Sequence, residues 1–243
     1  LGWLKSQIQN HEGSIKAYTK AIQLDPEDYE AYNNRGVAKE KVIGLDSAID
    51  DYKKALEINP KFKLAFNNLE LAKKSKNTIN TFKVSEFLAK GHDEMSVGNF
   101  QGAIENYTKA IELDPKNISG YNYRGYSKGQ LGNHKEAIID YSKAIELDPK
   151  NIYAYNSRGH NKGQLGNHKE AIIDHSKAIE LDPNKSSSYY YRGHSYGSMG
   201  NYEAGIVDFT KAIKLDPNSA FFYWGRGHLK ELIGEIDGAI ADY

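Results

Sequence analysis

Residues 118–151 read ISGYNYRGYSKGQLGNHKEAIIDYSKAIELDPKN, and residues 152–185 repeat the phrase as IYAYNSRGHNKGQLGNHKEAIIDHSKAIELDPNK. Each copy is 34 residues long and contains Leu-Asp-Pro near its end. Self-similarity at a fixed period of this length indicates an array of stacked repeats, each packed only on its neighbours. The period therefore decides the fold class.

The same phrase recurs along the rest of the chain. Leu-Asp-Pro or Ile-Asn-Pro ends at Pro26, Pro60, Pro115, Pro149, Pro183 and Pro217, with spacings of 34, 55, 34, 34 and 34 residues. The spacing of 55 is one period plus 21 residues. The chain thus divides into complete units 29–62, 84–117, 118–151, 152–185 and 186–219, partial units 1–28 and 220–243, and a spacer at 63–83.

Each unit predicts two helices. In 118–151, apolar and small residues recur at helical spacing from Tyr121 to Leu131, and again from Lys135 to Leu147. Gly132 is a helix-stop signal between them, and Asp148-Pro149 ends the second helix because proline cannot continue it. No strand pattern is evident, so we expect an all-α fold.

The composition excludes several classes of function. Lys and Arg total 32 and Asp and Glu total 32, so the chain lacks the basic surplus of a nucleic-acid-binding protein. It contains no cysteine and no apolar run of the ~20 residues that a membrane span needs. With no signal-like stretch at its start, we expect a cytoplasmic location without membrane insertion.

The repeated pattern large–x–x–R–G–(x)5–L–G–(x)4–A–I–x–D–Y–x–K–A–I–E–L–D–P resembles the tetratricopeptide repeat (TPR). The resemblance covers all but about 21 residues. It implies helix-turn-helix units stacked into a right-handed α-solenoid, whose first helices line a concave groove. It also implies a protein that holds other proteins, without catalytic residues or a cofactor.

Comparing the units with one another predicts a set of ion pairs. Arg at the seventh position of a unit always occurs together with Asp at the twenty-third. The two units with Leu1 or Lys90 instead of Arg have Ala17 and Asn106 instead of Asp. We therefore expect structural pairs between the two helices of a repeat, held by charge-assisted hydrogen bonds: Arg35–Asp51, Arg124–Asp140, Arg158–Asp174, Arg192–Asp208 and Arg226–Asp242.

The spacer suggests a boundary. Residues 63–74 resemble a first helix, but a polar, basic stretch follows in place of a second one. This predicts a short array over 1–74 that ends in a capping helix, a polar linker at 75–83, and a longer array over 84–243. A kinked but continuous solenoid is the alternative. Both ends cut through a repeat, so we expect further repeats beyond them or end-to-end packing on another molecule.

The resemblance implies which positions line the groove, namely 2, 5, 6, 9 and 13 of each unit. The residues there are rich in Tyr, His and Asn and almost lack formal charge. Amides can satisfy a peptide backbone, and aromatic rings offer contact area with a polar tip. The predicted peptide-binding residues are Asn122, Tyr123, Tyr126, Tyr153, Asn156, His160, Tyr190, Tyr191, His194, Phe221, Trp224 and His228.

Two more specific functions are rejected. The dicarboxylate clamp, by which some members of the family bind the acidic chaperone tail, uses three cations and two asparagines at five positions. This chain has Leu88, His92, Tyr123, Tyr153 and Ser157 there or, one repeat later, Asn122, Tyr126, Ser157, Ser187 and Tyr191, and neither set contains the Lys and Arg that a carboxylate pair requires. A metal site at His160, His194 and His228 is not expected, because stacked helices lie 8–10 Å apart whereas zinc ligands converge at ~2.0–2.1 Å.

The sequence therefore predicts a non-enzymatic scaffold or adaptor that binds an uncharged or mixed peptide, or a protein, in a concave groove. Two alternatives remain open. One is a structural subunit of a larger assembly, and the other is the substrate-binding or targeting segment of a larger enzyme. The exposed ends of the array favour either alternative, and the aromatic, polar groove favours the adaptor.

Overall fold

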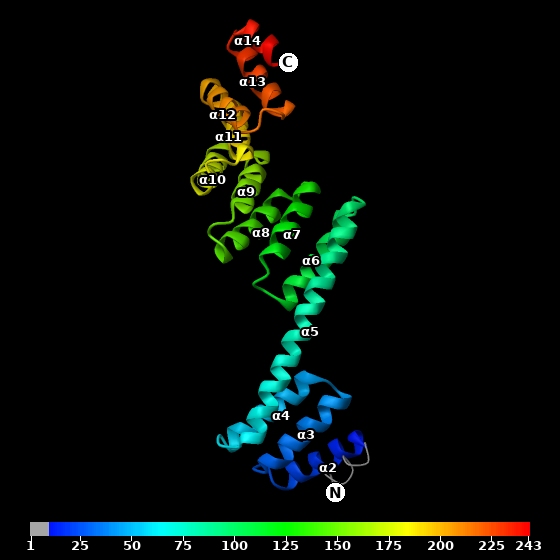
Figure 1. Ribbon diagram of the computed structural model, residues 1–243. Coiled ribbons are helices and arrows are strands. Elements are labelled where there is room, and N and C mark those ends of the chain that lie inside the picture. Colours follow the sequence, from blue (N-terminus) through cyan, green and yellow to red (C-terminus); the bar gives the residue numbers. More distant parts are fainter. Residues whose placement is uncertain (1–9) are drawn as a thin grey trace. The chain divides into compact units, whose positions relative to one another are not determined.

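The computed structural model describes residues 10–243, which form thirteen α-helices and no β-strand. Within two compact units, helices that are consecutive in the sequence pack side by side (Figure 1). The first unit ends at Phe82, and the second is Lys83–Tyr243. The predicted all-α solenoid of stacked helix pairs is confirmed. The helices are α2 (His11–Leu24), α3 (Tyr29–Val42), α4 (Leu45–Ile58), α5 (Lys63–Ser96), α6 (Phe100–Leu113), α7 (Ile118–Gln130), α8 (His134–Leu147), α9 (Ile152–Gln164), α10 (His168–Leu181), α11 (Ser186–Ser198), α12 (Tyr202–Leu215), α13 (Ala220–Leu232) and α14 (Ile236–Asp242).

The turns follow from the repeated phrase. Gly132 and Gly166 have φ of 78° and 80°, a left-handed conformation that glycine adopts without the strain of a Cβ. At the other end of the repeat, the Asp148 carboxylate accepts a hydrogen bond from the N–H of Lys150 at 3.0 Å. The aspartate of the Leu-Asp-Pro phrase therefore stabilises the turn that follows the second helix.

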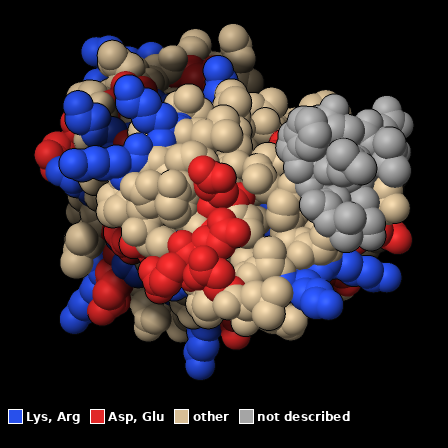
Figure 2. All heavy atoms as spheres, turned by 90° about the horizontal axis from the view of Figure 1, so that it is seen from below, with Lys and Arg blue, Asp and Glu red and all other residues tan. Residues whose placement is uncertain are grey.

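Charged side chains of both signs share the molecular surface. Lys143 and Glu146 on α8 form an exposed pair one turn apart, and Lys177 and Glu180 form the same pair on α10. The face shown in Figure 2 carries acidic and basic groups together, in keeping with the zero net charge of the chain.

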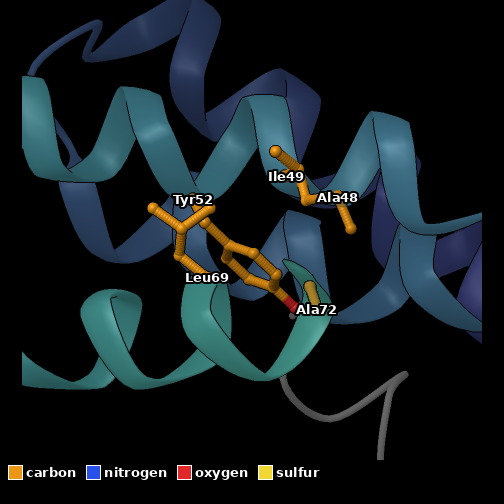
Figure 3. Close-up of a cluster of buried hydrophobic side chains, with 5 residues drawn as sticks. All are labelled: Ala48, Ile49, Tyr52, Leu69 and Ala72. Carbon is orange, nitrogen blue, oxygen red and sulfur yellow. The ribbon is translucent and has the colours of Figure 1, made fainter. Parts of the chain in front are cut away.

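The cores are thin and local. In the first unit, Tyr52 and Ile49 of α4 pack with Leu69 and Ala72 of α5 (Figure 3). The Tyr52 ring lies where a Cβ on Gly36 of α3 would come within 2.6 Å of it. Small residues on first helices thus admit the large rings of second helices, which sets the close approach of each pair.

Helix α5 differs from the predicted linker. Residues 75–83 lie inside α5, a continuous helix of 34 residues. Neither glycine nor proline occurs between residues 61 and 90, so nothing in the sequence ends the helix. The Thr78 hydroxyl bonds to the Lys74 carbonyl one turn earlier, and Lys76 pairs with Asp46 of α4. The segment is helical, whereas the division into two arrays stays a prediction.

Candidate functional site

Four pockets lie along the first helices of the second unit, in the part of the chain that the structure describes. Their volumes are about 330, 180, 250 and 250 Å³ in chain order. We name them after one residue each and call the row the groove. The His92 pocket is lined by His92, Met95, Ser96, Phe100, Tyr123, Tyr126 and Tyr153. The Asn161 pocket is lined by Tyr126, Gly129, Gln130, His134, Tyr141, Tyr153, Ser157, His160, Asn161 and Tyr191. The His175 pocket is lined by His160, Gly163, Gln164, His168, His175, Tyr190, Tyr191, His194, Ser195 and Ser198, and the Trp224 pocket by His194, Gly197, Ser198, Phe209, Trp224, Gly225, His228, Leu229 and Leu232.

Shared walls connect the pockets. Tyr126 and Tyr153 belong to the first two, and His160 belongs to the second and third. His194 belongs to the third and fourth. Each of these side chains comes from a first helix. Tyr126, His160 and His194 all stand at position nine of the repeat, which returns to the same face at every period of 34 residues. The groove is therefore one continuous surface.

The groove is electrically neutral. Among the described residues that line the four pockets, none is Lys, Arg, Asp or Glu. Burial lowers the pKa of His160 and of His194, and burial raises the pKa of the Tyr190 and Tyr191 phenols. These side chains are therefore uncharged at neutral pH and act through hydrogen bonds and ring contacts.

Ring contacts fix the aromatic side chains. The ring of Tyr190 meets those of His194 and Phe222 at centroid distances of 4.9 and 5.3 Å. Trp224 stacks on His228 at 5.7 Å with planes only 10° apart. Preorganised rings lose little entropy when a ligand packs on them.

Nine of the twelve predicted groove residues line these pockets. Tyr123, Tyr126, Tyr153, His160, Tyr190, Tyr191, His194, Trp224 and His228 do so. Their role in binding remains a prediction.

The other three predicted residues lie elsewhere. Asn156 is only 6% exposed, donates to the Ser188 hydroxyl at 2.7 Å, and so joins two repeats. Phe221 is 71% exposed and lines none of the four described pockets. Asn122 is half-buried, and its Oδ1 has no hydrogen-bond partner among residues 10–243.

Two histidines outside the predicted set, His134 and His168, also line the groove. His134 Nδ1 lies 2.9 Å from Asn161 Oδ1 in the Asn161 pocket, and His168 lines the His175 pocket. A signal was available, because other repeats have large or apolar residues at this position, such as Phe100 and Tyr202. A repeat position that holds large apolar residues in other units indicates a side chain that packs against its neighbours.

Each predicted Arg–Asp pair is in contact. In all five, Nε donates to one carboxylate oxygen at 2.7–2.9 Å and Nη2 to the other at 2.5–2.8 Å. The bidentate geometry is that of strong, charge-assisted hydrogen bonds. Leu1, which entered the comparison of repeats, lies outside the described residues.

The same arginines also join one repeat to the next, which the comparison did not predict. Nη1 of Arg158 donates to Ser142, sixteen residues earlier on the preceding second helix, at 3.1 Å. Equivalent bonds reach Thr19, Thr108, Ser176 and Thr210. Each guanidinium also lies over a tyrosine ring, at Tyr32, Tyr121, Tyr155, Tyr189 and Tyr223. The arginines are therefore structural connectors rather than free ligand-binding groups.

Two classes of site find no support in residues 10–243. No group of three or more His, Asp or Glu residues there is arranged to hold a metal ion. None of the described helices is both long and apolar enough to cross a membrane.

Comparisons with solved structures show where this fold occurs. MamA is 27% identical to the chain, with 66% of this chain and 87% of MamA covered and a TM-score of 0.58. A TPR protein from Parabacteroides merdae ATCC 43184 is 19% identical, with 99% and 87% covered and a TM-score of 0.52. YrrB, described as a TPR protein with an unusual peptide-binding site, is 22% identical, with 89% and 99% covered and a TM-score of 0.52. No curated protein matches the chain.

Family models match the repeats themselves. Models of the tetratricopeptide repeat match residues 118–151 and 186–219, and also 29–62 and 152–185. A model described as TPR repeat matches residues 7–42 and 91–132. The matches together cover most of the chain and identify it as a protein-interaction scaffold. The chain belongs to the tetratricopeptide repeat family.

Proposed function

We propose that the chain is a non-enzymatic adaptor that holds an extended segment of a partner protein in the groove. The observation that carries the proposal is the groove itself, with four connected pockets whose described lining residues include no formal charge. Aromatic rings, imidazoles and amides fill it, and these groups recognise a neutral or mixed peptide.

The dimensions suit a short linear segment. Packed helices lie about 8–10 Å apart, so four successive pockets span about 30 Å. An extended peptide rises about 3.3 Å per residue, so about nine residues would fill the groove. Gln130 and Gln164 are exposed and supply amides that can pair with the backbone of such a segment.

The lining chemistry argues against an acidic chaperone tail as the partner. An acidic chaperone tail needs paired cations, and the described lining of the groove supplies no Lys or Arg. Catalysis is not part of the proposal. The Ser195 hydroxyl in the His175 pocket donates to the carbonyl of Tyr191, so it is engaged as a structural group.

A phage-displayed library of linear peptides of about twelve residues, selected on the full chain, tests the proposal. The triple variant Tyr191→Ala, His194→Ala, Trp224→Ala should weaken binding of an enriched peptide at least about thirtyfold, because truncating an aromatic anchor commonly costs about 2 kcal/mol or more. Fluorescence anisotropy measures the affinities, and circular dichroism checks that the variant is folded.

A second candidate function has an observation of its own. Ile139, Ile173 and Val207 occupy the same position on three successive second helices, and each is 67% exposed. Such a row favours a structural subunit that buries its second helices in an assembly. The triple variant Ile139→Ala, Ile173→Ala, Val207→Ala is the matched control in the peptide assay. If it abolishes binding and the groove variant does not, the adaptor proposal is wrong and the structural subunit is favoured.

A further inference from the structure

The His175 pocket gathers four imidazoles. His160 on α9 and His194 on α11 are the most accessible of the four although the pocket partly desolvates their rings, His168 at the start of α10 is half-buried, and His175 further along α10 is buried. Tyr191 links them, with its ring 5.7 Å from those of both His160 and His175. The Tyr190 ring meets His194 at 4.9 Å.

No carboxylate accompanies these imidazoles among the described residues that line the pocket. Asp174 is the acidic group that acts on His175, and Arg158 and Lys162 hold it at 2.7 Å each. Two cations also act on His175, namely Lys162 and Arg192. Arg192 is paired with Asp208. The remaining groups that act on the exposed pair are other histidines, His134 on His160, and His160 and His228 on His194.

The pocket is thus rich in hydrogen-bond donors but has no anion of its own to balance a protonated imidazole. Burial and the neighbouring histidines lower the pKa of His194, so the protein groups of the pocket by themselves disfavour a positive charge there. A carboxylate placed between His160 and His194 would reverse that balance, since an opposite charge within ~4–6 Å favours the charged imidazole.

We propose that the His175 pocket is the subsite for one carboxylate side chain, Glu or Asp, of the bound peptide, and that one proton enters the pocket with it. The inference rests on the proposed peptide-binding function and specifies one residue of its ligand. His160 or His194 takes up the proton and becomes an imidazolium, so the added charges of carboxylate and proton cancel. Tyr190 and Ser198 provide further polar groups around the bound side chain.

A pocket of about 250 Å³ suits a single acidic side chain. A second carboxylate in the same space would repel the first, because like charges raise the cost of ionisation at close range. The neighbouring Asn161 and Trp224 pockets contain two histidines each against four here, and the Trp224 pocket is lined by Phe209, Leu229 and Leu232 as well. We therefore expect a mixed peptide with one acidic residue flanked by neutral ones.

Two capped amino acids test the proposal on the full chain. N-acetyl-glutamate methylamide carries the carboxylate, and N-acetyl-glutamine methylamide has almost the same shape without the charge. NMR of chain labelled with ¹³C in the histidine rings follows each imidazole between about pH 7.5 and pH 5.5. The glutamate probe should raise the titration midpoint of His160 or His194 by about one pH unit, and should bind about tenfold more tightly at the lower pH. The glutamine probe should do neither.

Variants locate the effect. The double variant His160→Gln, His194→Gln should remove the response to the glutamate probe, whereas His92→Gln should leave it intact, because the His92 pocket shares no lining residue with the His175 pocket. Equal responses to both probes, an equal response to inorganic phosphate, or an unchanged response in the His160→Gln, His194→Gln double variant would each overturn the carboxylate subsite. If library peptides bind through the groove but show no acidic preference, the proposed function stands and this inference fails.

Discussion

Arg158 and Asp174 form a bidentate ion pair in which Nε lies 2.9 Å from Oδ2 and Nη2 lies 2.7 Å from Oδ1. The carboxylate is almost fully buried, and the guanidinium remains partly accessible. Lys162, one turn beyond Arg158 on α9, gives Asp174 a second cation at 2.7 Å. One buried anion is thus shared between two cations of the same helix.

A double-mutant cycle should show strong coupling between Arg158 and Asp174. Asp174→Ala leaves two cations without their anion and should cost about 2–4 kcal/mol of unfolding free energy, somewhat below the range for fully buried pairs. After Arg158→Met, the same change should cost clearly less. Urea denaturation measures the four species, with the exposed pair Lys177–Glu180 as a control that should show no measurable coupling. Additive losses at Arg158 and Asp174 would contradict the pairing.

The repeats differ in how many cations each aspartate has, which gives a second prediction. In 186–219 the position of Lys162 is taken by Tyr196, and among residues 10–243 Asp208 is paired with Arg192 alone. Arg192→Met should therefore destabilise the chain by about 1–2 kcal/mol more than Arg158→Met, since it leaves a buried carboxylate with no counter-charge. Equal urea midpoints for the two variants would show that Lys162 does not compensate for the loss of Arg158.

The sequence predicted one half of this network and missed the other for a physical reason. Arg and Asp lie within one repeat, so comparing repeats shows them varying together. The hydroxyl that accepts from Arg lies on the preceding repeat, as Ser142 does for Arg158. Comparing positions within single units therefore cannot show this bond. Comparing each unit with the next one would have given a hint, because Lys53 replaces the hydroxyl residue in the one complete unit whose successor has Leu69 in place of Arg.

The groove was predictable in outline but not residue by residue. Position within the repeat assigns a side chain to one face of its helix. Nine of the twelve residues predicted for the groove line the four pockets. Whether a short amide reaches the groove depends on its neighbours. Asn156 bonds to Ser188 and lies 3.3 Å from His175, so the identity of two other residues decides its burial.

The segment 75–83 shows a different limit. Its lack of apolar period suggested a linker, yet it is helical within α5. An apolar period arises only where one face of a helix is buried. A helical stretch that is largely exposed has no buried face and therefore shows no such period. The absence of glycine and proline was the better guide there.

Acid should destabilise the chain through His175. Burial lowers the pKa of this imidazole to about 3, against an ordinary value near 6.5. Between these values the unfolded chain binds a proton that the folded chain does not, so stability falls as pH drops below about 6.5, by about 1.4 kcal/mol per pH unit. His175→Phe, which matches Phe209 in the next repeat, should remove this part of the slope. Urea midpoints from about pH 7 to pH 4.5 measure it, and parallel curves for wild type and variant would contradict the assignment.

Gly159 and Gly163 lie four residues apart on α9, and replacing each with alanine should change the stability of the chain in opposite directions. A Cβ at Gly159 would lie 2.6 Å from the buried His175 ring, whereas at Gly163 the nearest atom is His168 Nδ1 at 3.8 Å. Gly159→Ala should therefore cost about 1–3 kcal/mol through overpacking. Gly163→Ala should gain up to about 0.5–1 kcal/mol from helix propensity. Thermal and urea unfolding of the two variants provide the comparison, and each serves as the other's control for adding a methyl group to this helix. If both variants gain stability, the α9 and α10 backbones can separate enough to admit a side chain, and close approach at Gly159 is not what positions His175 beneath the groove.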